Sequence, residues 1–198
     1  MRVSIFDYGV GNLHSLAKAI VAAGGTPEIV TDPARAATAG AVILPGVGAF
    51  TAAADRLANG RHELRNAILG GLPTLGICLG MQLLFRESEE GPGEGLAVLE
   101  GHVERLRAIS VPQIGWNGIE DSHEPLIAES ALSTAYYANS FVCRPDEASI
   151  VSSWSVHEQD RFPATVRRGR TVGAQFHPEK SSAPGVEFLR QFLREAAA

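Results

Sequence analysis

The first half of the chain alternates short, continuous apolar runs with segments of helical periodicity. Apolar runs at 3–6, 26–30, 41–45 and 73–77 predict strands, and the segments 13–23, 50–69 and 79–87 predict helices, the second with a break near Asn59-Gly60. Continuous rather than alternating apolar strands are typical of parallel sheets covered on both faces. We therefore expect a parallel sheet between two helical layers.

The pattern changes after the Gly-rich segment 89–95. Short β-like pieces fill residues 96–176, Arg168-Gly169 resembles a hairpin turn, and 184–196 is an amphipathic helix. We expect these later strands to be antiparallel and to join the same sheet. The prediction is an α/β fold, a three-layer αβα sandwich forming a single domain over 1–198.

Composition narrows the function classes. The 198 residues are 45% hydrophobic and 20% charged, and 17 basic against 22 acidic residues give a net charge of −5. This balance lacks the basic footprint of a nucleic-acid-binding protein. The two cysteines have neither disulfide-framework nor metal-ligand spacing. No apolar run reaches the roughly 18 residues of a membrane helix, and 1–12 lacks a signal-peptide core, so we expect a cytoplasmic protein without a metal.

A cysteine stands where the fourth predicted strand meets a helix. Gly76-Ile77-Cys78-Leu79-Gly80 is the G-x-C-x-G counterpart of the nucleophile elbow, in which glycines allow the strand and helix backbones to approach. The helix N-terminus would favour a thiolate. The alternative is a small buried hydrophobe, the commonest state of free cysteine; Cys143, without such a context, is expected to be structural.

Two further segments carry complementary chemistry. His177 and Glu179 follow an apolar strand two positions apart, so that in extended chain both would point to one side, with the carboxylate orienting the base. The alternative is a surface turn in which Glu179 pairs with Lys180. Gly46-Val47-Gly48 follows another strand and could present N–H groups to an oxyanion, or be an ordinary turn. Nucleophile, base and oxyanion loop together indicate acyl transfer.

These motifs resemble those of the class I, cysteine-dependent glutamine amidotransferases. "GICLGMQ" and "QFHPE" match the wider class, while "LPGVGAF", "VPQIGWN" and "HPEKSS" resemble the glutaminase subunits of imidazole glycerol phosphate synthase. The resemblance implies a flavodoxin-like amidotransferase fold and a triad of Cys78, His177 and Glu179 that needs no cofactor. It implies oxyanion donors at Leu79 and in the 46–48 loop.

The same resemblance implies further sites. Gln82, Ser140 and Phe141 would hold the substrate glutamine. The ammonia released would pass to a (β/α)8-barrel synthase subunit, which makes imidazole glycerol phosphate and AICAR from PRFAR in histidine biosynthesis. The residues that would face this partner are Asn12, Trp116, Tyr136 and Lys180; for Trp116 and Tyr136 core packing is the alternative.

The chain departs from the family pattern in two places. Gln113 stands where the family usually has histidine, and 138–141 reads "ANSF" where it usually has "VHSY" or "VHTY". These departures leave the triad intact but favour, as an alternative, a paralogous glutaminase feeding a related synthase in specialised or cell-surface metabolism. A non-enzymatic subunit on the same fold is a third hypothesis. The acidic segment 87–94 is expected to be a solvated loop.

Overall fold

A seven-stranded sheet forms the centre of the molecule. The computed structural model describes residues 1–9, 13–46 and 48–198. The strand order is β2-β1-β3-β4-β11-β10-β9. Its parallel part consists of β1 (Arg2–Phe6), β2 (Thr26–Val30), β3 (Val42–Leu44), β4 (Thr74–Ile77) and β11 (Thr171–Ala174). The four parallel strands predicted from the first half of the sequence are confirmed, each within two residues of its predicted range. β11, which was expected among the antiparallel strands, instead pairs parallel with β4.

Two antiparallel strands complete one edge of this sheet. They are β10 (Asp160–Arg168) and β9 (Val151–His157). β10 turns into β11 at Gly169, whose φ of 58° is the left-handed conformation that a tight hairpin requires. The expected hairpin is therefore confirmed.

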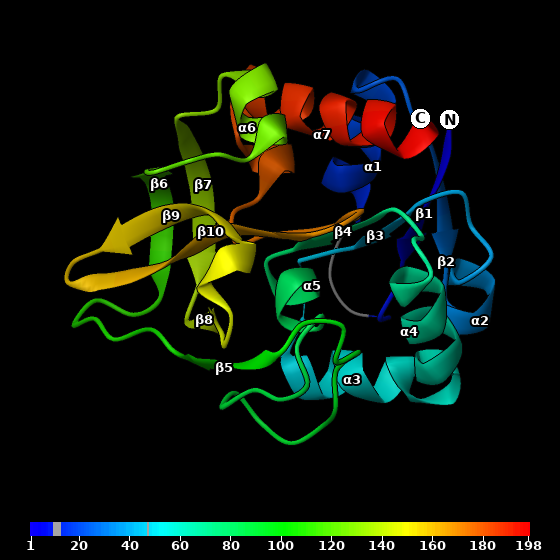
Figure 1. The fold of residues 1–198 in the computed structure, drawn as a ribbon, viewed down its shortest axis with the longest axis horizontal. Coiled ribbons are helices and arrows are strands. Elements are labelled where there is room, and N and C mark those ends of the chain that lie inside the picture. The colour runs from blue at the N-terminus through cyan, green and yellow to red at the C-terminus, as the bar shows by residue number, and fades with distance from the viewer. Residues whose placement is uncertain (10–12, 47) are drawn as a thin grey trace.

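Helices cover both faces of the sheet (Figure 1). The face at the top of the view carries α1 (His14–Ala22), α6 (Pro125–Ser130) and α7 (Ser182–Ala197). The opposite face carries α2 (Pro33–Ala36), α3 (Phe50–Leu57), α4 (Arg61–Leu69) and α5 (Leu79–Gln82). The 3-10 turn η1 (Ala58–Gly60) separates α3 from α4 where the break was predicted; η2 (Ala148–Ile150) and η3 (Pro178–Lys180) are the other 3-10 turns among the described residues. The three-layer sandwich is confirmed.

Four of the antiparallel strands do not join the central sheet, which corrects the sequence expectation. β5 (Gly101–Arg105) pairs with β8 (Phe141–Pro145), and β6 (Gln113–Gly118) pairs with β7 (Thr134–Asn139), as separate two-stranded sheets. The β6–β7 ribbon is connected to the rest of the protein by Ala135 and Tyr137, which are buried in the core, and by hydrogen bonds such as Asn117 Nδ2 to the Val156 carbonyl at 2.8 Å. We use "β6–β7 ribbon" for these two strands throughout.

The helix expected over 79–87 ends at Gln82. Beyond it the chain forms tight turns, in which the N–H of Leu84 donates to Met81 O and that of Phe85 to Gln82 O. Leu83, Leu84 and Phe85 are all fully buried. A continuous helix would expose one side of three consecutive apolar residues, whereas the turns bury all three.

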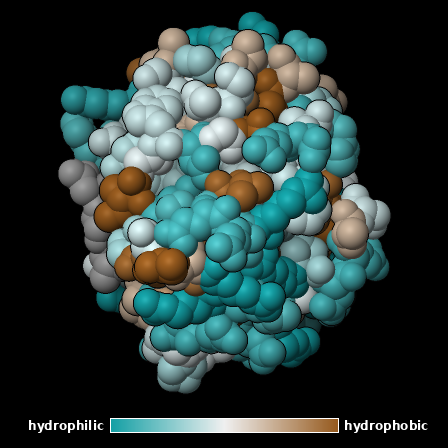
Figure 2. All heavy atoms as spheres, turned by 90° about the vertical axis from the view of Figure 1, so that its left-hand side faces the viewer, coloured by the Kyte–Doolittle hydropathy of each residue, from teal (hydrophilic) through white to brown (hydrophobic). Residues whose placement is uncertain are grey.

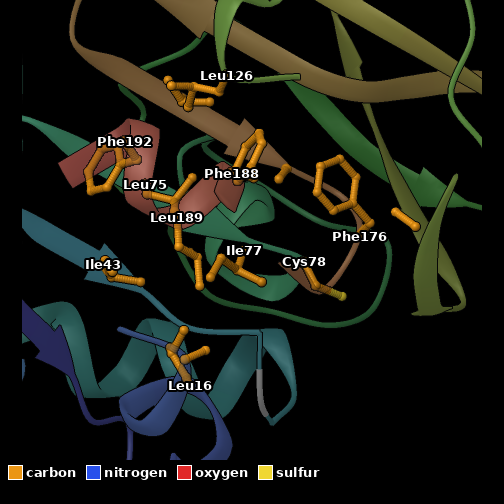
Figure 3. Close-up of a cluster of buried hydrophobic side chains, with 14 of the residues drawn as sticks. Leu16, Ile43, Leu75, Ile77, Cys78, Leu126, Phe176, Phe188, Leu189 and Phe192 are labelled. Atoms are coloured by element: carbon orange, nitrogen blue, oxygen red, sulfur yellow. The ribbon is translucent and has the colours of Figure 1, made fainter. Parts of the chain in front are cut away.

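The hydrophobic core has one cluster on each side of the sheet. In Figure 3 the cluster under α1 and α7 includes Leu75, Ile77 and Phe188, and Cys78 lies at its edge, at the end of β4. The carboxyl ends of the parallel strands are thus held by packed side chains on both faces. None of the helices in the described parts of the chain has the length and apolarity needed to cross a bilayer.

Candidate active site

Cys78 stands at a sharp strand-to-helix turn. β4 ends at Ile77 and α5 begins at Leu79, and Cys78 between them has φ 48° and ψ −106°. The two flanking glycines are steric requirements of this turn. A Cβ on Gly80 would lie 1.9 Å from the Leu44 carbonyl oxygen, and one on Gly76 would lie 2.6 Å from the Gly80 carbonyl oxygen. The backbone therefore holds Cys78 in a conformation that residues with a Cβ rarely adopt.

The Cys78 thiol is largely buried but has polar neighbours. The residue is 6% exposed, and its Sγ lies 3.9 Å from the Ala138 carbonyl oxygen. Gln175 Nε2 donates to the same sulfur at 3.6 Å. Gln175 is fully buried just after β11, and sequence reasoning missed it although it belongs to the quoted "QFHPE". The sulfur thus has a hydrogen-bond donor directed at it.

The structure brings His177 and Glu179 together at the neighbouring strand end. His177 Nδ1 and Glu179 Oε1 are 2.8 Å apart, with the side chains only 4% and 9% exposed. His177 itself is extended, and Pro178 begins the 3-10 turn η3, which carries the carboxylate back to the imidazole. The His177 N–H donates to Tyr136 O at 2.8 Å, which fixes the segment against β7.

Two opposing influences set the protonation of His177. Burial lowers its pKa, but the hydrogen bonds and charges of Cys78 and Glu179 outweigh burial and raise the pKa to about 10. Because Glu179 occupies Nδ1, the other ring nitrogen is the one left for the sulfur. The imidazole is therefore held as an imidazolium beside Cys78 at neutral pH.

The glycine loop after β3 lies against both groups. A Cβ on Gly46 would lie 2.8 Å from Cys78 Cβ and 2.9 Å from His177 Cε1, so only glycine fits there. Gly48 has a φ of 99°. Val47, one of the residues expected to contribute an oxyanion donor, lies outside the described residues. Leu79 is the first residue of α5, so its N–H has no acceptor within the helix.

A cavity of about 200 Å³ opens in front of Cys78. It is lined by Cys78, by every substrate-binding residue expected from the sequence and by the described residues expected to bind the oxyanion: Gly46, Gly48, Leu79, Gln82, Ser140 and Phe141. Ala138, Asn139 and Glu90 complete the lining. Gln82 Nε2 donates to the Phe141 carbonyl oxygen at 3.2 Å. We call this space the front cavity.

Glu90 corrects the expectation that the whole acidic segment 87–94 is a solvated loop. Its carboxylate lines the front cavity, and its Oε2 accepts the N–H of Phe50, the first residue of α3, at 3.1 Å. That contact spans 40 positions in the chain, so no local sequence signal could have revealed it. The negative charge lies where a helix N-terminus stabilises it.

A second cavity, of about 260 Å³, reaches the same groups from the other side. It is lined by Leu13, Ser15, Leu16, Pro45, Gly46, His177, Glu179 and Lys180. Gly46 and His177 border this rear cavity, and Gly46 also lines the front cavity. Two cavities that share Gly46 in their walls therefore border the site.

Three of the four residues expected to face a partner lie together on the surface. Trp116 and Tyr136 are directly opposite on the β6–β7 ribbon, with ring centroids 6.3 Å apart, and Lys180 Nζ lies 5.6 Å from the Tyr136 ring centroid. Trp116 is 56% exposed and its neighbour Ile114 67%, which argues against core packing for Trp116. We call Ile114, Trp116, Tyr136 and Lys180 the outer patch. The fourth residue, Asn12, lies outside the described residues.

The surface on this side of the molecule is mixed. Figure 2, which looks onto the side that carries the β6–β7 ribbon, shows separate hydrophobic patches within a hydrophilic surface. Such a mixture resembles the surface of subunits that also exist apart more than that of obligate dimers, whose interfaces are mostly apolar.

Comparison with known proteins supports one family. Residues 4–196 match the family model described as "Glutamine amidotransferase class-I". Proteins named "Imidazole glycerol phosphate synthase subunit HisH" are similar over nearly their whole length. The one from Pyrobaculum aerophilum is 41% identical, covering 99% of each chain, and the one from Synechococcus elongatus is 37% identical, covering 100% of this chain and 94% of the relative.

Solved structures agree on the fold. A structure titled "Crystal structure of glutamine amidotransferase" superposes with a TM-score of 0.75 at 22% identity, covering 99% of both chains. The "Structure of PurLQS from Thermotoga maritima" gives 0.73 at 18% identity, covering 100% of this chain and 99% of that one. The family model and the close relatives, together with this fold, show that the chain belongs to the class-I glutamine amidotransferases and, among them, to the HisH subunit family.

Proposed function

We propose that the chain is the glutaminase subunit of an imidazole glycerol phosphate synthase, hydrolysing glutamine to glutamate and ammonia through a thioester on Cys78. One observation carries the proposal. Cys78, on its elbow, lines the front cavity together with Gln82, and the buried His177–Glu179 pair lies beside the Cys78 thiol, where it lines the rear cavity.

The reaction follows from the positions of these groups. The Cys78 thiolate attacks the carboxamide carbon, and the negative charge moves to the carbonyl oxygen, beside the free N–H of Leu79 and the 46–48 loop. The His177 imidazolium donates its proton to the nitrogen, the C–N bond breaks, and ammonia leaves a thioester. Water then attacks the thioester while His177 accepts one proton, and the C–S bond breaks to release glutamate.

Charge at the front cavity suits an amino acid substrate. The Glu90 carboxylate would bind the α-ammonium group of glutamine, and backbone N–H groups of 140–141 together with the second Gln82 amide proton would bind its carboxylate. The side-chain carboxamide then points to Cys78. Glutamate differs by a charge at that carboxamide, so this arrangement favours glutamine as the reacting species.

The outer patch is the proposed docking surface for the (β/α)8-barrel synthase subunit. It combines an exposed tryptophan and a tyrosine, two residue types enriched among interface hot spots, with Lys180 beside the tyrosine ring. The rear cavity has Lys180 of this patch in its wall, and it is the proposed exit for ammonia towards the barrel, where PRFAR is converted to imidazole glycerol phosphate and AICAR. Passage inside the complex would keep ammonia unprotonated.

A comparison of nitrogen sources tests the proposal. With its barrel partner, the Cys78→Ala protein should lose glutamine-dependent synthesis while added ammonium still supports product formation. The Cys143→Ala protein is the control, because Cys143 is fully buried on β8 and should leave both activities intact. Equal loss with both nitrogen sources would contradict the proposed division of labour.

The second candidate is a paralogous glutaminase that supplies a related synthase. Gln113 and Asn139, which replace the family's usual histidines, lie opposite each other on the β6–β7 ribbon beside the outer patch, where a different partner would be selected. Complementation of a strain that lacks the histidine-pathway subunit discriminates the two. Growth without histidine supports the first candidate, and failure with a folded protein supports the second.

A further inference from the structure

The strand β7 and the residues just after it contact three groups that the proposed reaction uses. The Tyr136 carbonyl accepts the His177 N–H at 2.8 Å, and the Ala138 carbonyl lies 3.9 Å from Cys78 Sγ. Just beyond the strand, the Phe141 carbonyl accepts Gln82 Nε2 at 3.2 Å. The position of this one segment therefore affects the base, the nucleophile and the substrate-binding amide together.

A second amide converges on the Phe141 carbonyl. Asn139 Nδ2 donates to it at 3.2 Å, the same distance as Gln82 Nε2. Gln82 is on the helix that follows the nucleophile, whereas Asn139 is on β7 and lines the front cavity. The shared carbonyl oxygen thus joins the ribbon to the substrate pocket.

Gln113, on β6, is the register partner of Asn139. It is directly opposite Asn139 in the β6–β7 register, and both residues are 4% exposed. Gln113 Oε1 and Asn139 Oδ1 are buried acceptors without a donor among the described residues. Buried acceptors without partners destabilise a folded protein, so two apolar residues would serve stability better here. Asn139 lines the front cavity, so its amide contributes to the pocket instead.

The two faces of the ribbon have different roles. Alternate positions place Gln113 and Asn139 inward, while Ile114 and Trp116 point outward into the outer patch. A partner that shifts the ribbon from outside would therefore move the Asn139 amide inside.

We propose that Asn139, which lies opposite Gln113 in the β6–β7 register, is a positioning residue of the glutamine pocket. Its amide holds the Phe141 carbonyl oxygen against the Gln82 amide. It does not touch the reacting atoms and acts only through that carbonyl. This inference rests on the proposed function, because it assigns to the ribbon the control of the same pocket.

Covalent labelling of the free chain separates pocket from nucleophile. A diazoketone analogue of glutamine alkylates a thiol with loss of N2, and its KI reports binding while its kinact reports the thiolate. Iodoacetamide alkylates the same thiol without needing the pocket. The modified peptide is identified by mass spectrometry, and Cys143 is buried from both reagents.

In the Asn139→Leu protein the KI should rise about threefold to tenfold, because one neutral hydrogen bond is lost. The kinact and the iodoacetamide rate should stay within about twofold of those of the unsubstituted chain. The Asn139→His protein should restore KI, because the imidazole Nδ1 can place an N–H near the position of Asn Nδ2. The Asn117→Leu protein is the matched control. It loses an amide-to-carbonyl bond on the same ribbon, to Val156 rather than Phe141, and should leave KI unchanged.

The outcomes are distinguishable. If the unsubstituted chain is not labelled at Cys78 by the diazoketone, the proposed function fails and this inference with it. If it is labelled but Asn139→Leu leaves KI unchanged, this inference alone is overturned. Parallel loss of iodoacetamide reactivity, a failure of histidine to restore KI, or an equal effect of Asn117→Leu would also overturn it.

Discussion

The elbow at Cys78 and the β6–β7 ribbon differ in how much free space surrounds their backbone. At the elbow, Gly80 has no room for even one added carbon, since its Cβ would lie 1.9 Å from the Leu44 carbonyl oxygen. On the ribbon, a Cβ on Gly118 would have no heavy atom within 4 Å. The elbow therefore has no free space around its glycine, whereas the ribbon has open space at Gly118 and packs into the core through inward side chains such as Tyr137.

This difference matches a division of roles within the proposed active site. The elbow and the His177–Glu179 pair need one geometry for any acyl transfer, and close packing supplies it. The ribbon carries the outer patch and the departures from the family pattern at Gln113 and Asn139. These departures lie outside the close contacts that hold the elbow, so partner choice can vary while the geometry of the proposed chemistry stays the same.

The largest expected effect comes from adding one methyl group at the elbow. The Gly80→Ala protein should lose more than about 4 kcal/mol of unfolding free energy, because neither the Leu44 backbone nor α5 can move without opening the core. Chemical denaturation monitored by circular dichroism measures this. Normal stability would mean that the strand and helix can separate at little cost, and the contrast with the ribbon would disappear.

The next effect concerns the buried pair. The Glu179→Gln protein should lose glutaminase activity by on the order of 10³-fold, since the amide no longer stabilises the imidazolium. The carboxylate helps to raise the pKa of His177 to about 10, so its removal lowers that pKa. His177 then loses its proton at a lower pH, and the alkaline limit of the diazoketone labelling rate should move downward. A limit that stays in place would show that Glu179 does not set the charge of His177.

A moderate effect is expected from the outer patch. The Trp116→Ala protein should bind the barrel partner about 30-fold more weakly, the usual loss for an interface tryptophan, while labelling of Cys78 in the free chain stays unchanged. Leu69→Ala is the control, since Leu69 is 51% exposed on α4, which lies on the opposite side of the molecule in Figure 1. Calorimetric titration measures the affinities. Equal losses in both proteins would remove the outer patch as the docking surface.

The smallest effect is the counterpart of the first. The Gly118→Ala protein should change unfolding free energy by no more than about 1 kcal/mol, because the added methyl group meets open space. The same denaturation experiment measures it beside Gly80→Ala. A cost comparable to that of Gly80→Ala would show that the ribbon is as tightly constrained as the elbow.

Sequence pattern predicted the regions held by packing and missed contacts made across the chain. The continuous apolar strands and the glycines around Cys78 are local signals, and they indicated the sheet and the elbow correctly. Glu90 reaches the front cavity through a bond to Phe50, and an acidic segment with glycines gives no sign of that. The end of α5 at Gln82 depends on the burial of Leu83–Phe85 from all sides. Apolar periodicity alone predicts that the helix continues through these residues.

The ribbon shows the same limit. Nothing local distinguishes strands that join the central sheet from strands that form their own, because the choice depends on which edge is already occupied. β10 and β9 extend that edge, and β6 and β7 pair with each other. The opposition of Gln113 and Asn139 is likewise a matter of register, which two distant segments settle only when they meet.

The left-handed backbone at Cys78 has a consequence for how this sequence can change over time. A residue with a Cβ held at a φ of 48° costs the fold on the order of 1–3 kcal/mol, and glycine would relieve that strain. Selection for folding alone would therefore favour losing the thiol. A lineage that no longer needed glutamine as a nitrogen source would gain thermal stability from the substitution that ends the chemistry.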